Sequence, residues 1–542
     1  MPRKRAVSRL RLGPVIGHTD EASARVWIRV FDDPIDYQLR VQGAGLFDFA
    51  STEGGLEFRT AIATATGLRP DRRYRYSVLR RGRVVARSRG SFRTMPAPGS
   101  MANLLFCVIS CSTTHFDGLW EQFSRFIETA KPHFVLMVGD QAYIDEDEPN
   151  VFADHFLSAP AARREALAEA YQANWSREPV RKVMASVPVY MMWDDHEIRD
   201  GWGSLASDSP TMLAKHPRGA EIFGKCNAYF EDCRDAYWHF QACHNPLALP
   251  VQPLPNYIEA PPLPGQRRAM PYAFRCGRLV VLVLDSRGAR DVFRQELPIL
   301  GAEQWGFIRQ VFDTLPADVE ALAVVTATPI ASMDPGGQVQ KLLGDRTDDI
   351  VAFRHGDIDG VLHPKSSGEK SDIPLAIANV HLSRLAGRQL NLGNYKVSNI
   401  DEARDQWSHK YARPEQAALL RLAGTARTAN TSGGAARSLV FLSGDIHVGC
   451  IFDIESSEPE YRAASLTSSG ISAQQDEVLV GVYVDEAFTV AQGIRSTLRE
   501  VVKEFNFGVV QVMPTGAGAE ITPLLAHEGS STVWGLDVAD LL

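Results

Sequence analysis

Apolar and polar residues alternate along the first part of the chain in short runs that are typical of β-strands. The run Ser23–Val30 alternates in this way, so that its apolar residues share one face. The runs Tyr74–Leu79 and Arg83–Ser88 flank a tight turn at Arg81-Gly82, which is a hairpin signal. Several strands at this spacing within residues 10–94 predict a small β-sandwich.

The pattern changes after a proline-rich linker at Met95–Ser100. From there on, nearly continuous apolar runs alternate with helical patterns such as Leu119–Thr129 and Glu303–Phe312. The apolar runs that we expect to form strands are Leu104–Ile109, Phe134–Val138, Val187–Met192, Leu279–Leu284, Leu322–Thr326 and Leu439–Leu442. Strands that are apolar throughout are buried on both faces, so this part is predicted to be an α/β domain whose sheets are covered by helices.

The length of 542 residues exceeds what one hydrophobic core supports, so two or more domains are expected. We predict an N-terminal β-domain at residues 1–98 and a larger domain at residues 101–542. Two long connections interrupt the larger domain. Residues 200–275 combine a helix with a proline-rich loop, and residues 343–400 form the second connection. Long connections of this kind usually build the rim of a functional site.

Composition excludes several classes of protein. With 45% apolar and 23% charged residues, the chain is neither a disordered tail, a collagen-like fibre nor a simple coiled coil. No run approaches the roughly 20 consecutive apolar residues of a membrane-spanning helix. The basic N-terminus lacks the apolar segment of an export signal, and seven cysteines are too few for a disulfide scaffold. We therefore expect a cytoplasmic protein with no transmembrane segment.

Charge is unevenly distributed along the chain. Residues 1–100 hold 19 Lys and Arg against 9 Asp and Glu, whereas the remaining residues hold 38 against 56. The basic excess could serve contact with nucleic acid or a membrane, or could only solvate the hairpin faces, and no nucleic-acid-binding motif accompanies the arginines. The acidic excess of the larger domain fits carboxylates that are gathered around a cation.

Polar and titratable side chains directly follow five of the predicted strands. In chain order they are Cys111; Asp140 and Tyr143; Asp194, Asp195, His196, Glu197 and Asp200; Asp285 and Arg287; and Asp445 and His447. Ligands bind at the carboxyl ends of strands in layered α/β proteins, so we expect these side chains to converge. Buried carboxylates in this number are too costly to leave uncompensated, and bound cations would remove the cost. A mixed set of histidine and carboxylate ligands large enough for two metals suits metal-assisted hydrolysis.

Other readings of these residues are weaker. The phosphate-binding P-loop, the GxSxG nucleophile elbow and the HExxH zinc motif are all absent from the sequence. Cys111 could act as a nucleophile paired with His115 or His196, but nearby carboxylates would raise the thiol pKa and oppose that role. Cys111 could instead be an inert buried thiol like Cys107. The whole set could also form a non-catalytic metal-binding module.

The motifs, taken in order, resemble a known family. They are Cys111, GDQAY at Gly139–Tyr143, WDDHE at Trp193–Glu197, LDSR at Leu284–Arg287, LGAEQW at Leu300–Trp305 and SGDIH at Ser443–His447. This set resembles the alkaline phosphatase D (PhoD-like) metallophosphatases, within the calcineurin-like metallophosphoesterase superfamily. The resemblance implies a four-layer α/β/β/α sandwich preceded by a small fibronectin-like β-sandwich.

The resemblance also implies a binuclear or larger metal site. Cys111, Tyr143 and His447 would bind iron(III), and Asp140 would bridge this ion and a second metal. The chemistry of the donors agrees with this assignment, since thiolate and phenolate are anionic ligands that fit a trivalent ion.

The second metal would be calcium or another divalent cation. The resemblance assigns it to Asp445, together with Asp195 or Asp200. Asp195 matches the asparagine ligand of the wider superfamily, and Asp200 stands where the family commonly has asparagine. His196 matches the superfamily's catalytic histidine.

The predicted reaction is the hydrolysis of phosphate esters by a metal-bound hydroxide, with Asp140 positioning the metals. His196 would protonate the leaving oxygen or stabilise the transferring group. Arg287 and His409 would contact the phosphate or hold the site in place. The expected substrate is a small phosphate monoester or diester. The alternative is a phosphodiesterase that acts on phospholipid or nucleic-acid ends, which the basic N-terminal domain would suit.

Overall fold

The computed structural model describes residues 10–52, 58–204, 208–214, 218–246, 269–337, 340, 404–429, 431, 435–474, 483–516 and 518–527. The connection predicted at residues 343–400 lies outside the described residues, and so do residues 247–268 of the proline-rich loop. None of the helices within the described residues is long and apolar enough to cross a membrane.

The N-terminal domain is a sandwich of two four-stranded antiparallel sheets. One sheet has the order β1 (Leu12–Thr19), β2 (Ala24–Arg29), β6 (Thr60–Ala65) and β5 (Ala50–Ser51). The other has the order β4 (Gly45–Asp48), β3 (Tyr37–Val41), β7 (Arg73–Arg80) and β8 (Arg83–Arg93). Val26, Leu39 and Val78 are buried in the core of this sandwich. The separate all-β domain expected from the alternating pattern is therefore confirmed.

The larger domain contains two sheets. The first has the order β11 (Val189–Met192), β10 (Phe134–Val138), β9 (Leu104–Ile109), β20 (Asn506–Thr515) and β21 (Gly518–His527). The second has the order β12 (Tyr272–Cys276), β13 (Leu279–Val283), β14 (Ala321–Val325), β15 (Ser438–Ser443), β17 (Glu460–Thr467), β16 (Gly449–Ser457), β19 (Ile494–Val502) and β18 (Ala487–Ala491). The strands predicted from apolar runs are parallel neighbours: β9, β10 and β11 in the first sheet, and β13, β14 and β15 in the second.

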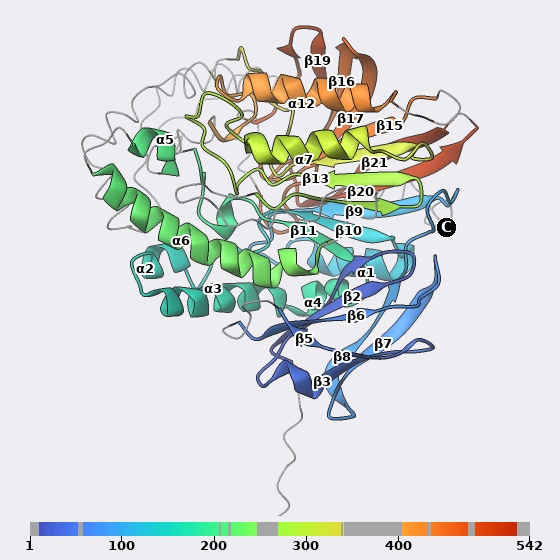
Figure 1. The fold of residues 1–542 in the computed structure, drawn as a ribbon. Coiled ribbons are helices and arrows are strands. Elements are labelled where there is room, and N and C mark those ends of the chain that lie inside the picture. The colour runs from blue at the N-terminus through green and yellow to red at the C-terminus, as the bar shows by residue number, and fades with distance from the viewer. Residues whose placement is uncertain are drawn as a thin grey trace, which may run out of the picture.

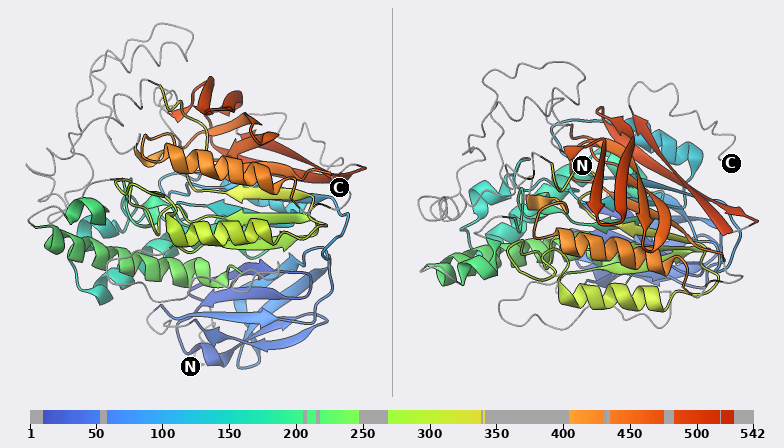
Figure 2. Two further views of the ribbon diagram at one scale, coloured as in Figure 1. Left: turned by 45° about the horizontal axis from the view of Figure 1, so that its top comes forward. Right: turned by 90° about the horizontal axis from the view of Figure 1, so that it is seen from above.

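The two sheets pack face to face and enclose a core that includes Phe106, Leu136 and Val281. Helices cover both outer faces (Figures 1 and 2). Over the first sheet lie α1 (Trp120–Ala130), α3 (Pro160–Trp175), α4 (Glu178–Met184) and α6 (Gly219–Phe240), and over the second lie α7 (Gly301–Asp313) and α12 (Arg413–Ala426). This is the four-layer α/β/β/α arrangement. Shorter helical segments are η1 (Pro34–Asp36), α2 (Val151–His155), η2 (Asp195–Glu197), α5 (Pro210–Leu213) and η4 (Ala242–His244).

The N-terminal sandwich packs directly on the helices of the first sheet. Trp27 of β2 is fully buried, and its indole N–H donates a hydrogen bond to the carbonyl of His239 at 2.8 Å. Its ring lies 6.0 Å from that of Trp175 and 5.8 Å from that of Phe240. Strand β2 is therefore covered on both faces, by the core of its own domain and by the helices of the larger one.

Candidate metal centre

The loops that follow β9, β10 and β15 share an unusual backbone conformation. Cys111, Asp140, Asp445 and His447 have φ values of 58°, 57°, 76° and 55°. Left-handed backbone is uncommon for residues other than glycine and costs of order 1–3 kcal/mol at each position, so it persists where the surrounding structure enforces it. All four residues follow the carboxyl ends of these strands, so the extended conformation stops where the polar side chains begin.

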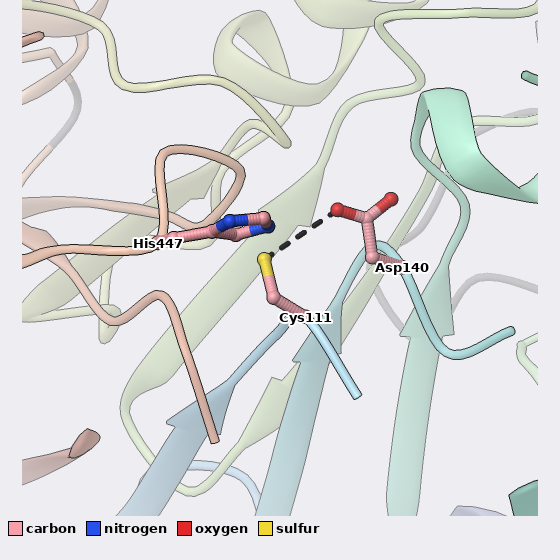
Figure 3. A group of neighbouring side chains, drawn as sticks. All are labelled: Cys111, Asp140 and His447. Atoms are coloured by element: carbon pink, nitrogen blue, oxygen red, sulfur yellow. Dashed lines mark hydrogen bonds between the residues drawn. The ribbon is translucent and has the colours of Figure 1, made fainter. Parts of the chain in front are cut away.

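A first group of ligand atoms joins Cys111, Asp140 and His447, whose candidate atoms all lie within 4.8 Å of one another (Figure 3). The Cys111 Sγ lies 3.4 Å from the Asp140 Oδ2. The Tyr143 hydroxyl is 2.8 Å from the His447 Nε2 and 3.5 Å from the Asp140 Oδ2. The structure thus brings together the four residues that the sequence predicts around one cation.

Two further groups adjoin the first. One joins Asp140, Asp195 and His196, and the other joins Asp194, Asp195 and Asp445, again with ligand atoms within 4.8 Å of one another. Asp140 belongs to the first two groups, and Asp195 belongs to the last two. The three groups therefore form one continuous set of donors, long enough for more than one cation.

The charges in this set point to a cation. Burial, with neighbouring carboxylates, raises the pKa of Asp140 and of Asp445 well above the usual range, and burial raises the pKa of Asp194 to about 7. Among the described residues, the buried Oδ2 of Asp194 accepts no hydrogen bond, and neither does the buried Oδ1 of Asp195, which has the Arg287 guanidinium 3.4 Å away. Buried carboxylate oxygens without donors are costly, and a cation would compensate them. The donor set therefore fits a metal centre.

Burial favours the neutral forms of the Cys111 thiol, the Tyr143 phenol and the His447 imidazole. Burial raises the pKa of Cys111 and of Tyr143 well above their usual values, and lowers that of His447 to about 4. A neutral imidazole is ready to bind a metal, whereas the thiol and phenol need a cation to ionise them. The raised thiol pKa also opposes the reading of Cys111 as a free nucleophile.

His196 is held by its neighbours. Its Nδ1 lies 2.8 Å from the Asp145 Oδ1, and its ring stacks on that of Tyr143 with 4.1 Å between ring centroids. Burial opposes protonation, but the carboxylates of Asp145 and Asp195 raise the pKa of His196 well above its usual value. The ring is thus fixed in orientation and favours its protonated form.

Arg287 is fully buried and links the carboxylates from several loops. Its terminal nitrogens donate to both oxygens of Asp405 at 2.5 and 2.7 Å, and its Nε donates to Asp194. They also lie 3.4 Å from Asp195 and 3.9 Å from Asp445. Burial alone would lower the pKa of Arg287, but these carboxylates raise it well above its usual value. Its contacts are those of a group that holds carboxylates in place.

Asp200 and His409 belong to none of the three ligand groups. The main-chain N–H of Asp200 donates to the Asp145 Oδ2 at 2.5 Å. His409 is buried in the loop before α12, and its ring packs edge-on against that of Tyr411. Of the two alternatives predicted for the second cation, the geometry brings Asp195 rather than Asp200 beside Asp445.

No role was predicted for Glu197 from the sequence. Its Oε2 accepts main-chain N–H groups from Asp140 at 2.9 Å and Asp194 at 2.8 Å. Its Oε1 accepts the N–H of Gln141 at 2.6 Å and the side-chain amide of Gln241 at 2.9 Å. This one carboxylate therefore ties together the loops after β10 and β11. Its place in the WDDHE motif was visible, but its partners are set by tertiary structure.

Ser469 is a second residue that sequence reasoning missed. Its hydroxyl lies 3.1 Å from the Cys111 Sγ and accepts the main-chain N–H of His447 at 2.6 Å. It thus bridges two members of the first ligand group. The only sequence signal was its position in the small-residue segment that follows β17.

Comparison with known proteins agrees with the geometry. The four-layer fold and the buried donor groups at its strand ends are consistent with a metallophosphatase. The chain belongs to the PhoD-like phosphatase family, whose model matches residues 106–514. Residues 7–98 match a separate family described as a domain of unknown function (DUF7800).

Two solved structures are similar to this chain. "Structure of PhoD" has a TM-score of 0.57 and 15% identity, and the match covers 97% of this chain and 92% of that chain. A purple acid phosphatase, PPD1, from yellow lupin (Lupinus luteus) seeds has a TM-score of 0.45 and 10% identity, with 92% of this chain and 69% of that chain covered. At these identities the likeness concerns the fold alone. A search of the curated proteins found no match.

Proposed function

We propose that this chain hydrolyses phosphate esters at a centre that holds two adjacent cations. The observation that carries the proposal is the position of Asp140, which belongs both to the group with Cys111 and His447 and to the group with Asp195 and His196. A carboxylate shared in this way is suited to bridging two metals. Membership of the PhoD-like phosphatase family supports phosphate-ester chemistry at this site.

We assign one cation to Cys111, Asp140, Tyr143 and His447, and propose that it is iron(III), because the thiol and phenol become anionic donors beside a strong positive charge. We assign calcium or another divalent cation to the carboxylates Asp194, Asp195 and Asp445, with Asp140 shared between the two cations, since oxygen-only donors suit hard divalent ions. When bound, two cations supply an activated water and neutralise the charge on the phosphate oxygens.

The remaining steps belong to the chain's own residues. His196, held by Asp145 and favouring its protonated form, is placed to give a proton to the leaving oxygen of the ester. Arg287 offsets the carboxylate charge around the centre and fixes Asp194 and Asp405 in position. We propose a small phosphate ester as the substrate, and both monoesters and diesters are compatible with these roles.

Substitution of Asp140 tests the proposal. Asp140→Asn removes the charge shared by both cations, so the metal content of the purified protein and its hydrolysis of p-nitrophenyl and bis-p-nitrophenyl phosphate should fall together. Changes in residues that only support a ligand lower metal affinity or activity about 10–100-fold, and loss of the shared ligand should exceed that range. Asp232→Asn is a matched control, because Asp232 is also a buried carboxylate but pairs with Arg163 and Arg164. An Asp140→Asn protein that folds and keeps both its metals and its activity contradicts the proposal.

A further inference from the structure

A second feature of the molecule lies between the two domains. A groove with a volume of about 900 Å³ opens between the β7–β8 hairpin of the N-terminal sandwich and the helices α1 and α4 of the larger domain. In Figure 1 these two helices lie just above the sandwich that contains β7 and β8. The cations that line this arginine groove are Arg73, Arg75, Arg87, Arg89, Arg181 and Lys182.

The arginine groove carries a strong excess of positive charge. Six cationic side chains line it, and the only acidic residue in its lining is Glu128. Arg73, Arg75 and Arg89 are exposed, and the described part of the chain contains no salt bridge to them. Like charges that face one another across a cavity repel, so this arrangement favours an anion between them.

The strand geometry explains why the cations gather on one side. Arg73 and Arg75 are two residues apart on β7, so their side chains point to the same face of the sheet. The register of the hairpin pairs Arg73 with Arg93 and Ser77 with Arg89, which places arginines along both strands. Helix α4 then contributes Arg181 from the opposite wall.

The two walls of the groove are joined by direct contacts. The Tyr76 hydroxyl donates to the carbonyl of Ala185 at 2.9 Å, and Arg181 donates to the carbonyl of Arg87 at 3.3 Å. Gly90 also belongs to the lining, and a Cβ at this position would lie 2.2 Å from the Ala185 carbonyl oxygen. The close approach therefore requires glycine, and the width of the groove is fixed by the fold.

The groove is remote from the candidate metal centre. Its larger-domain wall includes Ile127 and Ser186, which lie shortly before the amino ends of β10 and β11. The proposed ligands follow the carboxyl ends of these strands. A strand of five residues, such as β10, spans about 16 Å. The positive charge of the groove is therefore not part of the pocket around the reacting phosphate.

We propose that the arginine groove binds a chain of directly linked phosphates, that is, inorganic polyphosphate. Arginine guanidinium groups suit phosphate because they donate paired hydrogen bonds to its oxygens. Glu128 lies in the lining and Glu178 pairs with Lys182, so four of the six positive charges remain in excess. Four excess charges within one small cavity match a ligand whose phosphates follow one another without spacers. The lining contains no aromatic side chain on which a nucleobase could stack, which disfavours single-stranded nucleic acid. A concave groove also accommodates a polyphosphate chain better than it accommodates the flat surface of a bilayer.

Calorimetric titration of the full-length protein with tripolyphosphate tests this proposal. We expect binding that weakens as salt rises and that persists in Asp140→Asn, because the groove is separate from the catalytic centre. The double variant Arg75→Gln/Arg89→Gln should bind at least tenfold more weakly while hydrolysing p-nitrophenyl phosphate at the wild-type rate. Arg40→Gln/Arg83→Gln removes the same charge from exposed positions outside the groove and should bind within twofold of the wild type.

Four results would overturn the proposal. The first is equal binding by the groove variant and the wild type. The second is orthophosphate binding as tightly as tripolyphosphate, which would indicate a simple anion site. The third and fourth are tighter binding, lost in the same variant, of a 20-nucleotide oligo-dT or of phosphatidylglycerol vesicles. Those results would assign the groove to nucleic acid or to a membrane surface.

Discussion

Replacement of Glu197 by glutamine tests how the two loops of the candidate centre are held. The carboxylate accepts four hydrogen bonds, from the main chain of Asp140, Gln141 and Asp194 and from the side chain of Gln241. Glutamine has the same shape, but its side-chain amide has one oxygen that accepts hydrogen bonds and one nitrogen that donates them. The amide nitrogen is best tolerated beside Gln141 and Gln241, because the Gln241 amide can turn and offer its own oxygen. Only the N–H of Gln141 then loses its acceptor.

The size of the effect follows from these contacts. A hydrogen bond to a charged group contributes about 1.5–3 kcal/mol, and a buried donor left without a partner costs about 1–3 kcal/mol. Burial raises the pKa of Glu197 to about 7, so the comparison is made at pH 8.5, where the carboxylate is ionised. In Glu197→Gln the three hydrogen bonds that remain no longer involve a charged group, and one donor is left unsatisfied. We therefore expect the free energy of unfolding to fall by about 2–4 kcal/mol. Because Asp140 and Asp194 are displaced with their loops, metal affinity should fall about 10–100-fold, as for other groups that orient ligands.

Glu415 provides a matched control. It is also a buried carboxylate, and it accepts the main-chain N–H groups of Ile299 at 2.7 Å and Leu300 at 3.0 Å and the indole N–H of Trp305 at 2.7 Å. Glu415→Gln should lower stability to a similar extent and leave metal content unchanged. Urea unfolding and metal analysis of both variants separate the two effects. A Glu197→Gln protein that loses stability but keeps wild-type metal affinity and turnover would refute the positioning role.

Three further predictions concern the same centre. Iron-loaded protein should show a visible absorption band that Tyr143→Phe bleaches or shifts, with a smaller loss of activity than in Asp140→Asn; a colourless, iron-free and fully active wild type rules out the iron assignment. After chelation, the urea concentration at the unfolding midpoint should be lower at pH 8.5 than at pH 7. Buried carboxyls such as Asp140, whose pKa is raised, keep protons that the unfolded chain has already lost, so stability falls as the pH rises. A midpoint that is higher at pH 8.5 contradicts the argument. Gly139→Ala places a Cβ 2.5 Å from that of Asp194 at a φ of 102° and should lower stability by about 2–4 kcal/mol. Gly43→Ala, with a positive φ but nothing within 4 Å, should lower it less, and equal losses argue against the close contact.

Much of the architecture was predictable because local and global signals agree. The apolar runs that form β9, β10 and β15 are buried on both faces, and their carboxyl ends carry Cys111, Asp140 and Asp445. In a layered α/β fold such ends meet at one edge, so the convergence of these side chains follows from the order of strands and polar residues. The convergence of these side chains was therefore predictable, whereas their assignment to one cation was implied by the family resemblance.

The supporting contacts were not predictable, because they depend on packing between distant segments. Arg287 was expected either to contact the phosphate or to hold the site in place, and the sequence did not indicate that its guanidinium would be engaged by Asp194 and Asp405. In the sequence, Glu197 is one of several carboxylates in an acidic run. The four groups that donate hydrogen bonds to it are brought together only by the fold. The strands after residue 500 were also missed, since nothing local indicates that Asn506–Thr515 pairs with a strand near the start of the larger domain.

That last pairing has a consequence for how the protein is made. Strand β20 lies between β9 and β21, and from Ile109 at the end of β9 to Asn506 at the start of β20 the chain advances 397 residues. At ribosomal speeds of about 5–20 residues per second, roughly 20–80 s separate the two strands. During that interval the edge of β9 has no partner, and unpaired strand edges are the surfaces through which nascent chains associate wrongly. Recombinant yield should therefore depend more on chaperone supply during synthesis than on the stability of the finished fold.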